Sequence, residues 1–476
     1  MASFVIRIFR QALCALIPLV MLLAGCTMAP KYERPGLPTP NAYDKGAGLF
    51  GGPAPFIAWR GFFTDPGTQR LIETALTNNR DLRAAMLNVE KVRAQYRIQR
   101  ADILPTAAAM GESSNRGLPA GISGLPKRAV VRQHTVSVGA TNFELDLFGR
   151  IRSLTDAALE TYYSTEDDVK TAQITLVAEV AAVYLQMIAD KELLDITAAT
   201  CKNRKGQYEL VRNKFTSGVA SQLEVSQAKS IMEEARSNVA RYATRVGQDE
   251  NYLALLIGAP LPKDLPDVRK LSRIRMLADI PEGLPSSLLE RRPDIQASEH
   301  RLKAAYANIG AARANFFPTI NLTGGFGAIS ADASELFEGS TGFWQFLPSV
   351  SLPIFDTGRN ISRLDVAESE RKMAVTEYEK TIQEAFREVA DCLVQRQYIG
   401  SQMDAERELL KSTTESYNLA SARYDVGVDS YLNVLDAQRS LYSAQQSYIS
   451  TMLLRETNAL TLYKALGGGW DIAPGR

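Results

Sequence analysis

The sequence predicts a mainly α-helical protein that adds strands to a membrane β-barrel and carries an internal tandem duplication. Three observations support this prediction. The second half of the 476-residue chain repeats the first half, each half contains a long stretch without proline, and segments of alternating apolar and polar residues interrupt the helical stretches. The repeat is the primary evidence, because a repeated unit constrains the whole architecture.

The repeat consists of two blocks that align without gaps. Residues 79–82 (NRDL) open a block that recurs 213 residues later, from residues 292–295 (RPDI). Residues 218–228 match residues 427–437 at an offset of 209. Two ungapped blocks at nearly the same offset indicate a tandem duplication.

Each half contains a stretch that permits a very long helix. No proline occurs between Pro126 and Pro260, or between Pro353 and Pro474, and an interior proline would cost a helix about 3 kcal/mol. A helix over residues 155–215 would be about 90 Å long. Apolar residues follow each other at spacings of three and four, which predicts a left-handed coiled-coil seam. They are Val169, Ala172, Leu176, Val180, Val183 and Met187, and then Val375, Tyr378, Ile382, Ala385, Val389 and Cys392.

Two segments of alternating residues lie in each half. Residues 320–328 and 344–354 alternate in the second half, as do residues 135–138 in the first, where a change of phase near Thr141 predicts a bulge. The strand expected after Pro105 is poorer in large apolar residues. Segments of about ten residues with one apolar face are typical of membrane barrels, whose smallest members have eight strands. Four strands cannot close a barrel, so we expect several chains to share one.

The amino terminus is typical of an exported lipoprotein. Arg7 and Arg10 precede an apolar core, and Leu23-Ala24-Gly25 leads into Cys26. This pattern predicts lipidation of Cys26 with a diacylglycerol and an N-acyl chain, which would anchor the chain stably. The chain then divides into a signal peptide (1–25), a lipidated, proline-rich extended segment (26–60), a first repeat (61–258), a linker (259–285), a second repeat (286–467) and a C-terminal tail (468–476).

Composition and motifs exclude several functions. The 54 Lys and Arg residues balance 53 Asp and Glu residues, which argues against nucleic acid as a partner. His134 and His300 lie in no metal-ligand pattern, and no phosphate loop or nucleophile motif occurs. We therefore expect no catalytic residue, no metal and no cofactor beyond the lipid, so that the protein is not an enzyme. Cys201 and Cys392 lie too far apart along their helices to pair within one chain.

Several segments together resemble the TolC-like outer-membrane efflux proteins, in particular the lipidated branch that serves tripartite RND pumps. They are residues 26–35 (CTMAPKYERP), 143–150 (FELDLFGR), 289–295 (LERRPDI), 352–359 (LPIFDTGR), 424–427 (YDVG) and 435–438 (LDAQ). The resemblance implies a homotrimer with a twelve-stranded β-barrel on a long α-helical barrel. It also implies a lipid-anchored place in the outer membrane, extending into the periplasm. The implied partners are a periplasmic membrane-fusion adaptor and an inner-membrane RND transporter, and the implied cargo is drugs or other small toxic compounds.

Two tight turns join each long helix to the next one. Each turn supplies a glycine where a helix end needs a left-handed residue, and a serine that can cap the following helix. By resemblance these turns are the periplasmic tips that dock the adaptor. The tip residues are Gly218, Val219, Ala220 and Ser221, and then Gly427, Val428, Asp429 and Ser430.

The resemblance also implies a periplasmic gate at the second tip. Asp436 matches the family's acidic ring and lies four residues after Leu432, on the same helix face. Three such carboxylates around a threefold axis would repel one another and favour cations. Tyr424 matches a gate tyrosine, and Glu224 of the first half is a candidate polar partner. Asp429 stands where some relatives have arginine, which puts a tyrosine–arginine latch in doubt.

Two other functions stay open at this point. The chain could be the outer-membrane component of a type I protein-secretion system, although the lipidation motif favours the RND branch. It could also be a purely structural coiled-coil lipoprotein of the envelope, although alternating strands in both halves argue against this.

Overall fold

The computed structural model describes residues 27–40, 58–120, 127–274 and 291–468. The predicted signal peptide, Cys26 and most of the C-terminal tail lie outside these residues. The chain divides into two compact units. Unit 1 contains Val89–Thr165 and Ala297–Tyr378 together with the described residues before Leu37, and unit 2 contains Leu37–Asn88, Glu166–Gln296 and Glu379–Arg476, as far as they are described.

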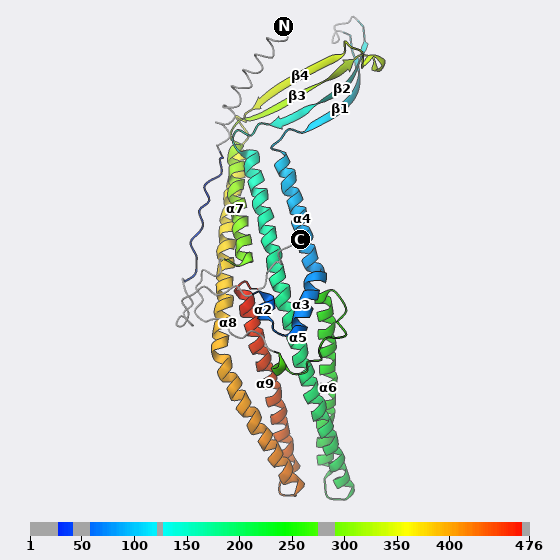
Figure 1. Cartoon of the computed structure of the whole chain (residues 1–476), viewed down its shortest axis with the longest axis vertical. Helices are drawn as coiled ribbons and strands as arrows, with labels where there is room; N and C mark the ends of the chain where they lie inside the picture. The colour runs from blue at the N-terminus through cyan, green and yellow to red at the C-terminus, as the bar shows by residue number, and fades with distance from the viewer. Residues whose placement is uncertain (1–26, 41–57, 121–126, 275–290, 469–476) are drawn as a thin grey trace. The chain divides into compact units, whose positions relative to one another are not determined.

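Unit 1 contains a four-stranded antiparallel sheet in the order β1-β2-β3-β4 (Figure 1). The strands are β1 (Ala107–Leu118), β2 (Ala129–Glu144), β3 (Thr319–Ser330) and β4 (Gly342–Ser351). Strands β2 and β3 come from different halves of the chain and pair with each other, so the duplication forms one sheet. The short 3-10 helix η3 (Ala333–Glu335) lies in the connection between β3 and β4.

The register brings apolar residues into rows across the sheet. Ala109 pairs with Val138, Val138 with Phe326, and Phe326 with Trp344. Val138, Phe326 and Trp344 are 43%, 67% and 80% exposed, so this row faces away from the protein interior. Such a face is unusual for a sheet in water.

The predicted bulge near Thr141 is confirmed. The register between β2 and β3 shifts between Ala140 and Phe143, and Asn142 adopts a left-handed backbone with φ 56°. The Asn142 amide donates to Thr323 Oγ1 at 3.0 Å. The one extra residue of β2 explains the change of phase in the sequence, because a bulge shifts the alternation of side chains.

Two helices of 67 residues run through the chain. They are α5 (Arg150–Thr216) and α8 (Arg359–Asp425), which at 1.5 Å per residue are each about 100 Å long. Both follow a glycine with positive φ, Gly149 (76°) and Gly358 (82°), which lie 209 residues apart. The long helices therefore begin at equivalent positions of the two halves, and they start slightly earlier than the sequence suggests.

The predicted seam residues are largely buried. Val180, Ile382, Ala385 and Val389 are each at most 1% exposed. One 18-residue stretch of α5 is apolar enough to cross a membrane, but 61% of it is buried inside the protein, as in a core helix. Cys201 and Cys392, the cysteines within the described residues, are unpaired as predicted.

The remaining helices complete the two repeats. The first repeat contributes α2 (Trp59–Phe62), α3 (Pro66–Asn78), α4 (Arg80–Ala101) and α6 (Gln222–Ile257). The second contributes α7 (Pro293–Ala314) and α9 (Tyr431–Ala465), and the 3-10 helix η1 (Leu271–Arg273) lies between the repeats. In unit 2, the ring of Phe62 stacks on Tyr463 with centroids 4.0 Å apart, which joins the first repeat to the second.

The ends of α6 and α9 are held in equivalent ways by different residues. Asn79 Nδ2 donates to the Leu256 carbonyl at 2.8 Å, and Arg292 Nη1 donates to the Ala465 carbonyl at 2.9 Å. Asn79 and Arg292 correspond in the first repeated block, and Leu256 and Ala465 in the second. Both side chains satisfy carbonyls that a helix end leaves without partners. The duplication thus preserves the hydrogen bond although the donor has changed.

Candidate functional site

The two turns between the long helices have the same backbone geometry. Gly218 and Gly427 adopt φ of 76° and 77°, as the sequence predicts. The amide of Val219 donates to the Lys214 carbonyl, and that of Val428 donates to the Arg423 carbonyl, each at 2.9 Å. This six-to-one bond, next to a left-handed glycine, satisfies the last carbonyls of a helix.

The serine caps of the two turns differ. Ser221 Oγ accepts from the Glu224 amide at 3.2 Å, and the Glu224 carboxylate accepts from the Ser221 amide at 2.6 Å. This reciprocal pair is a capping box. Ser430 occupies the N-cap position of α9 but makes no side-chain capping bond. The predicted serine cap is therefore confirmed in the first turn and wrong in the second, where Asn433 replaces the glutamate that would complete the box.

An apolar cluster in unit 2 joins the two turns. Its buried members are Val211 of α5, Ala228 of α6, and Tyr431, Val434 and Leu435 of α9. Tyr424 packs against this cluster, and Lys214 Nζ lies 4.1 Å from the centre of the Tyr424 ring. A cation over a tyrosine face is attracted by the ring. The expected gate tyrosine thus contacts a cation of the first turn within the same chain.

Asp429 forms an ion pair within the second turn. Its two carboxylate oxygens lie 2.6 Å from Arg423 Nε and 3.2 Å from Arg423 Nη2. This hydrogen-bonded guanidinium lowers the pKa of the Asp429 carboxyl. The arginine that holds the turn therefore comes from α8, six residues before Asp429. Lys214, which contacts Tyr424, corresponds to Arg423 in the first half.

Leu432 and Asp436 lie on the face of α9 that points away from the apolar cluster. Leu432 is 55% exposed, and the Asp436 side chain is 65% exposed. The nearest cation to Asp436 is Arg439, with Nη1 4.0 Å from Oδ1. The two expected gate residues thus share an exposed face. The Glu224 carboxylate is engaged in its own capping box.

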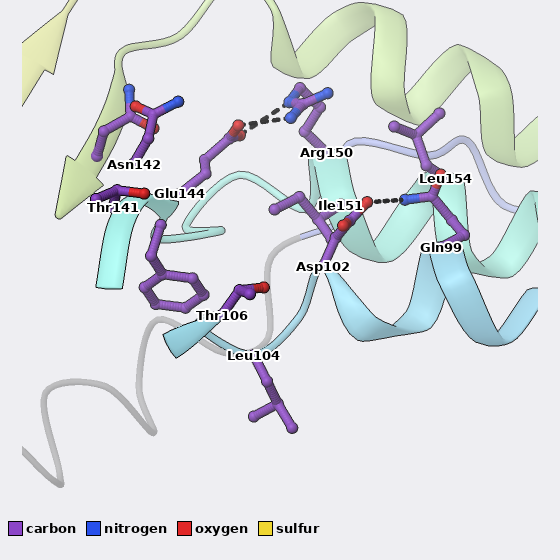
Figure 2. A pocket seen from close by; sticks show the side chains of 12 residues that line it. Gln99, Asp102, Leu104, Thr106, Thr141, Asn142, Glu144, Arg150, Ile151 and Leu154 are labelled. Carbon is purple, nitrogen blue, oxygen red and sulfur yellow. Dashed lines mark hydrogen bonds and ion pairs between the residues drawn. The ribbon is translucent and has the colours of Figure 1, made fainter. Parts of the chain in front are cut away.

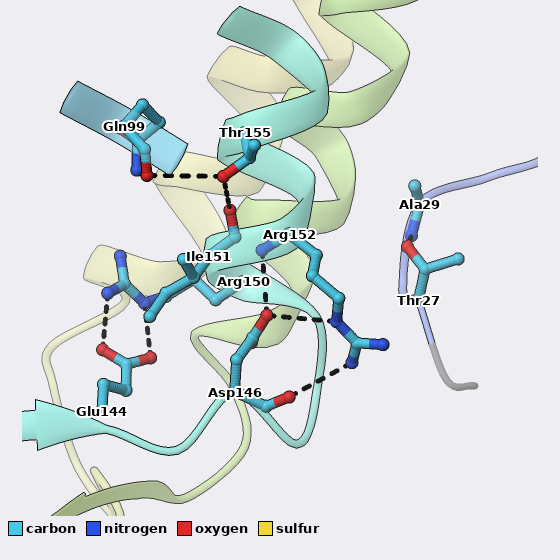
Figure 3. Close-up of polar contacts among 9 residues, drawn as sticks. All are labelled: Thr27, Ala29, Gln99, Glu144, Asp146, Arg150, Ile151, Arg152 and Thr155. Carbon is cyan, nitrogen blue, oxygen red and sulfur yellow. Dashed lines mark hydrogen bonds and ion pairs between the residues drawn. The ribbon is translucent and has the colours of Figure 1, made fainter. Parts of the chain in front are cut away.

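Two ion pairs fix the connection between β2 and α5 in unit 1. Arg150 donates from Nε and Nη2 to both oxygens of Glu144, at 2.8 and 2.5 Å. Asp146 accepts from the Arg152 amide at 2.9 Å and from Arg152 Nε at 3.3 Å (Figure 3). These bonds hold the strand end against the helix start. These four charged residues had no predicted role, although their spacing in the sequence, two acid–base pairs each six residues apart, was an available signal.

A polar cavity of about 450 Å³ lies beside this connection. Gln99, Asp102, Thr106 and Asn321 line it together with the Arg150–Glu144 pair (Figure 2). Glu144 already uses both oxygens on Arg150. Among the described residues, no group of three or more histidine, cysteine or acidic side chains could hold a metal ion.

The segment after Cys26 is extended and lies on α7 and α8. Tyr32 donates to Glu299 Oε1 at 3.0 Å, and Arg34 Nη2 lies 2.7 Å from Glu299 Oε2. Gly310 allows close approach, because a Cβ there would lie 2.7 Å from the Ala29 amide nitrogen. Burial and the neighbouring Glu299 carboxylate raise the pKa of the Tyr32 hydroxyl. Residues 27–40 form no helix or strand, residues 41–57 of the segment expected to be extended lie outside the described part of the chain, and helix α2 begins at Trp59 within it.

Comparisons with known proteins agree with this architecture. The model of the family described as outer membrane efflux protein matches residues 71–259 and again residues 284–468. The toluene efflux pump outer membrane protein TtgC of Pseudomonas putida is 45% identical over 465 residues, 97% of this chain and 96% of that protein. The outer membrane protein OprJ of Pseudomonas aeruginosa is 42% identical over 454 residues, 95% of each chain.

Solved structures share the fold. The open state of the Neisseria gonorrhoeae MtrE outer membrane channel has a TM-score of 0.84 and 38% identity, over 94% of this chain and 99% of that one. A crystal structure of a membrane protein from Pseudomonas aeruginosa has a TM-score of 0.86 and 41% identity, over 93% and 100%. The chain therefore belongs to the outer membrane efflux protein family, and its fold is TolC-like, as its sequence predicts.

Proposed function

We propose that three copies of this chain form the outer-membrane exit channel of a tripartite efflux pump, together with a periplasmic adaptor and an RND transporter. The main support for this proposal is that the four-stranded sheet has two unpaired edges among the described residues. Its strands run in the order β1 to β4, so the outer edges of β1 and β4 pair with no strand of the described chain. Open edges of this length invite pairing with another chain.

Strand directions support closure between copies. Each strand is antiparallel to the next, so β4 of one copy would meet β1 of the next copy in antiparallel fashion. Three copies would supply twelve strands, which exceeds the eight of the smallest membrane barrels. The exposed apolar row that contains Val138, Phe326 and Trp344 suits contact with lipid acyl chains.

Helix α4 supports assembly independently of the sheet. In this 22-residue helix Leu82 is the buried residue, while Met86, Leu87 and Ile98 are between 55% and 69% exposed. Apolar residues in such numbers on one helix are typical of a surface that a partner covers. In a shared barrel, a neighbouring copy of the chain would cover this face of α4.

The proposed cargo is small toxic molecules. The relatives are named as toluene, solvent and antibiotic efflux proteins, and 45% identity over nearly the full chain supports a similar role here. Lipidation of Cys26 and the extended segment held by Glu299 would fix the amino terminus to the outer membrane. Type I protein secretion is the second candidate, but no described feature favours it.

Complementation with a transport assay tests the proposal. A strain that lacks its own efflux channel but keeps the adaptor and transporter should regain tolerance to toluene or to an antibiotic when it expresses this chain. The purified protein should also conduct ions in planar bilayers. Conductance without restored tolerance would refute the efflux role, and absence of conductance would refute the channel. A chain without its amino terminus, expressed as a control, separates loss of targeting from loss of the channel.

A further inference from the structure

A cavity of about 340 Å³ in unit 2 lies among α5, α6 and α9. Its lining includes Asp190 of α5, Tyr242 and Arg245 of α6, and Gln446 of α9, among apolar side chains. Asp190 is 2% exposed. A buried carboxylate in a mixed cavity requires a donor for each of its oxygens, since leaving one without a donor is costly.

The hydrogen bonds around Asp190 leave that requirement unmet. Gln186 Nε2 donates to Asp190 Oδ2 at 2.8 Å. The other oxygen, Oδ1, is buried and receives no hydrogen bond from the described residues, and the same is true of Oδ2 of Asp249 on α6. Arg245 Nη1 lies 3.9 Å from Asp190 Oδ1, which is an ion pair but too long for a hydrogen bond. Arg245 also lies over the Tyr242 ring, 5.3 Å from its centre.

The two carboxyls are neighbours. Each has a buried oxygen that receives no hydrogen bond from the described residues, and a proton on Asp249 would let it donate to Asp190. Two neighbouring ionised carboxylates repel each other, and each can only accept hydrogen bonds. One proton between them converts an unfavourable pair into a donor and an acceptor. We propose that Asp190 and Asp249 share one proton at neutral pH and that this hydrogen bond holds α6 on α5.

The titration of the pair follows from its surroundings. Burial first, and then the Asp190 charge, raise the pKa of Asp249 to about 7. Arg245 opposes this shift, and Glu250 adds to it while it pairs with Lys191 at 3.2 Å. The side chains that α9 contributes to the cavity, among them Gln446, Ser450 and Thr457, carry no charge.

The pair should therefore stabilise the folded chain less as the pH rises. The folded chain holds the proton up to about pH 7, whereas an unfolded aspartate releases it near its ordinary value of about 3.9. Stability from this pair is fully present below the unfolded value and is lost as the pH rises through the folded value. The stabilisation should thus decline between about pH 4 and about pH 7, and above that range the proton bond is lost and α6 should be held less firmly on α5.

The second repeat gives a natural comparison. At the offset of 209, Asp190 corresponds to Ile399, and Asp249 corresponds to Asn458. Asn458 Nδ2 donates to the Cys392 carbonyl at 3.1 Å, so a neutral residue serves at that position of the fold. The shared proton is a property of the first half alone. The substitution Asp249→Asn introduces the residue that the second repeat already uses.

Infrared spectroscopy of the intact protein tests the proposal directly. The wild type should show the stretching band of a protonated carboxyl at about pH 6, and this band should fall with a midpoint near pH 7. Asp249→Asn should lack the band, and in Asp190→Asn the midpoint should lie below that of the wild type, because burial still raises the pKa of Asp249 but the neighbouring charge no longer does. A midpoint below about pH 5, or an unchanged band in Asp249→Asn, would overturn the assignment.

Thermal unfolding supplies a second readout and a matched control. The Tm of the wild type should fall between about pH 4 and about pH 7 and level off above that, and Asp249→Asn should remove this fall. Asp404→Asn makes the same chemical change at a side chain that is 73% exposed, and it should leave the fall unchanged. An equal pH dependence in wild type and Asp249→Asn would contradict the shared proton.

Discussion

At the scale of single residues, the tip turns depend on glycine because of backbone conformation alone. Gly218 and Gly427 have positive φ, and a Cβ at either position would meet no atom within 4 Å. The constraint is therefore not space. For residues other than glycine, the left-handed region costs about 1–2 kcal/mol.

Replacing Gly427 by alanine should consequently weaken the second tip by about 1 kcal/mol. Hydrogen exchange at residues 423–431 should report the change as faster exchange. Gly400→Ala is the matched control, because Gly400 lies inside α8 with equally open surroundings and an ordinary helical backbone. It should stabilise the protein slightly, by about 0.5–1 kcal/mol. Equal effects of the two substitutions would contradict the conformational explanation.

At the scale of elements, α6 and α9 have the same scaffold but different exposed faces near the tips. Leu432 and Asp436 correspond to Leu223 and Gln227 at the offset of 209. The leucine is common to both helices and is exposed in both, at 55% and 66%. The carboxylate of Asp436 has no counterpart on α6, where Gln227 stands at the equivalent position. A gate that depends on charge should therefore depend on α9.

The double substitution Leu432→Ala with Asp436→Ala should raise single-channel conductance and reduce the preference for cations. The reason is that three carboxylates and three leucines would leave the constriction of a trimer together. Leu223→Ala with Gln227→Ala changes the equivalent residues of α6 and should have a smaller effect on cation preference. Unchanged conductance in the α9 variant would refute the gate assignment.

The sequence predicted the elements better than the contacts between them. Proline-free stretches and the seam through Val180 and Val389 predicted both long helices, because helix period and proline cost are local properties. The change of phase predicted the bulge near Thr141. The capping role of Glu224 could have been predicted from the Ser221–Glu224 spacing, although the residue was predicted to be a polar partner of the gate.

Contacts between distant residues were beyond such reasoning. The Lys214–Tyr424 contact joins residues of different repeats, and the Tyr32–Glu299 bond joins residues 267 positions apart. No periodicity or spacing signals a pair of this kind. The same applies to Asp190 and Asp249, whose proximity depends on how α6 packs on α5.

At the scale of the whole molecule, the two halves of the duplicated chain share their scaffold but differ in their charged residues. Each half supplies two strands to one sheet and one helical hairpin to the tips. Scaffold features agree between the halves, namely the glycines before the long helices and the six-to-one bonds at the tips. Charged residues differ, since Asp436, Asp429 and the Asp190–Asp249 pair each occur in one half only. A trimer of such chains would be nearly sixfold in packing and threefold in charge.

The open sheet should close between copies of the chain, and cross-linking of its two edges is the sharpest test of this closure. In a Cys201→Ser, Cys392→Ser background, one cysteine replaces Ala109 on β1 and a second is scanned along Gly342–Ser351 on β4. At least one pair of cysteines should form disulfides between chains, in a ladder of products that ends at three chains. A disulfide between β1 and β4 of the same chain, a ladder that ends at another number, or no cross-link at any position would contradict it.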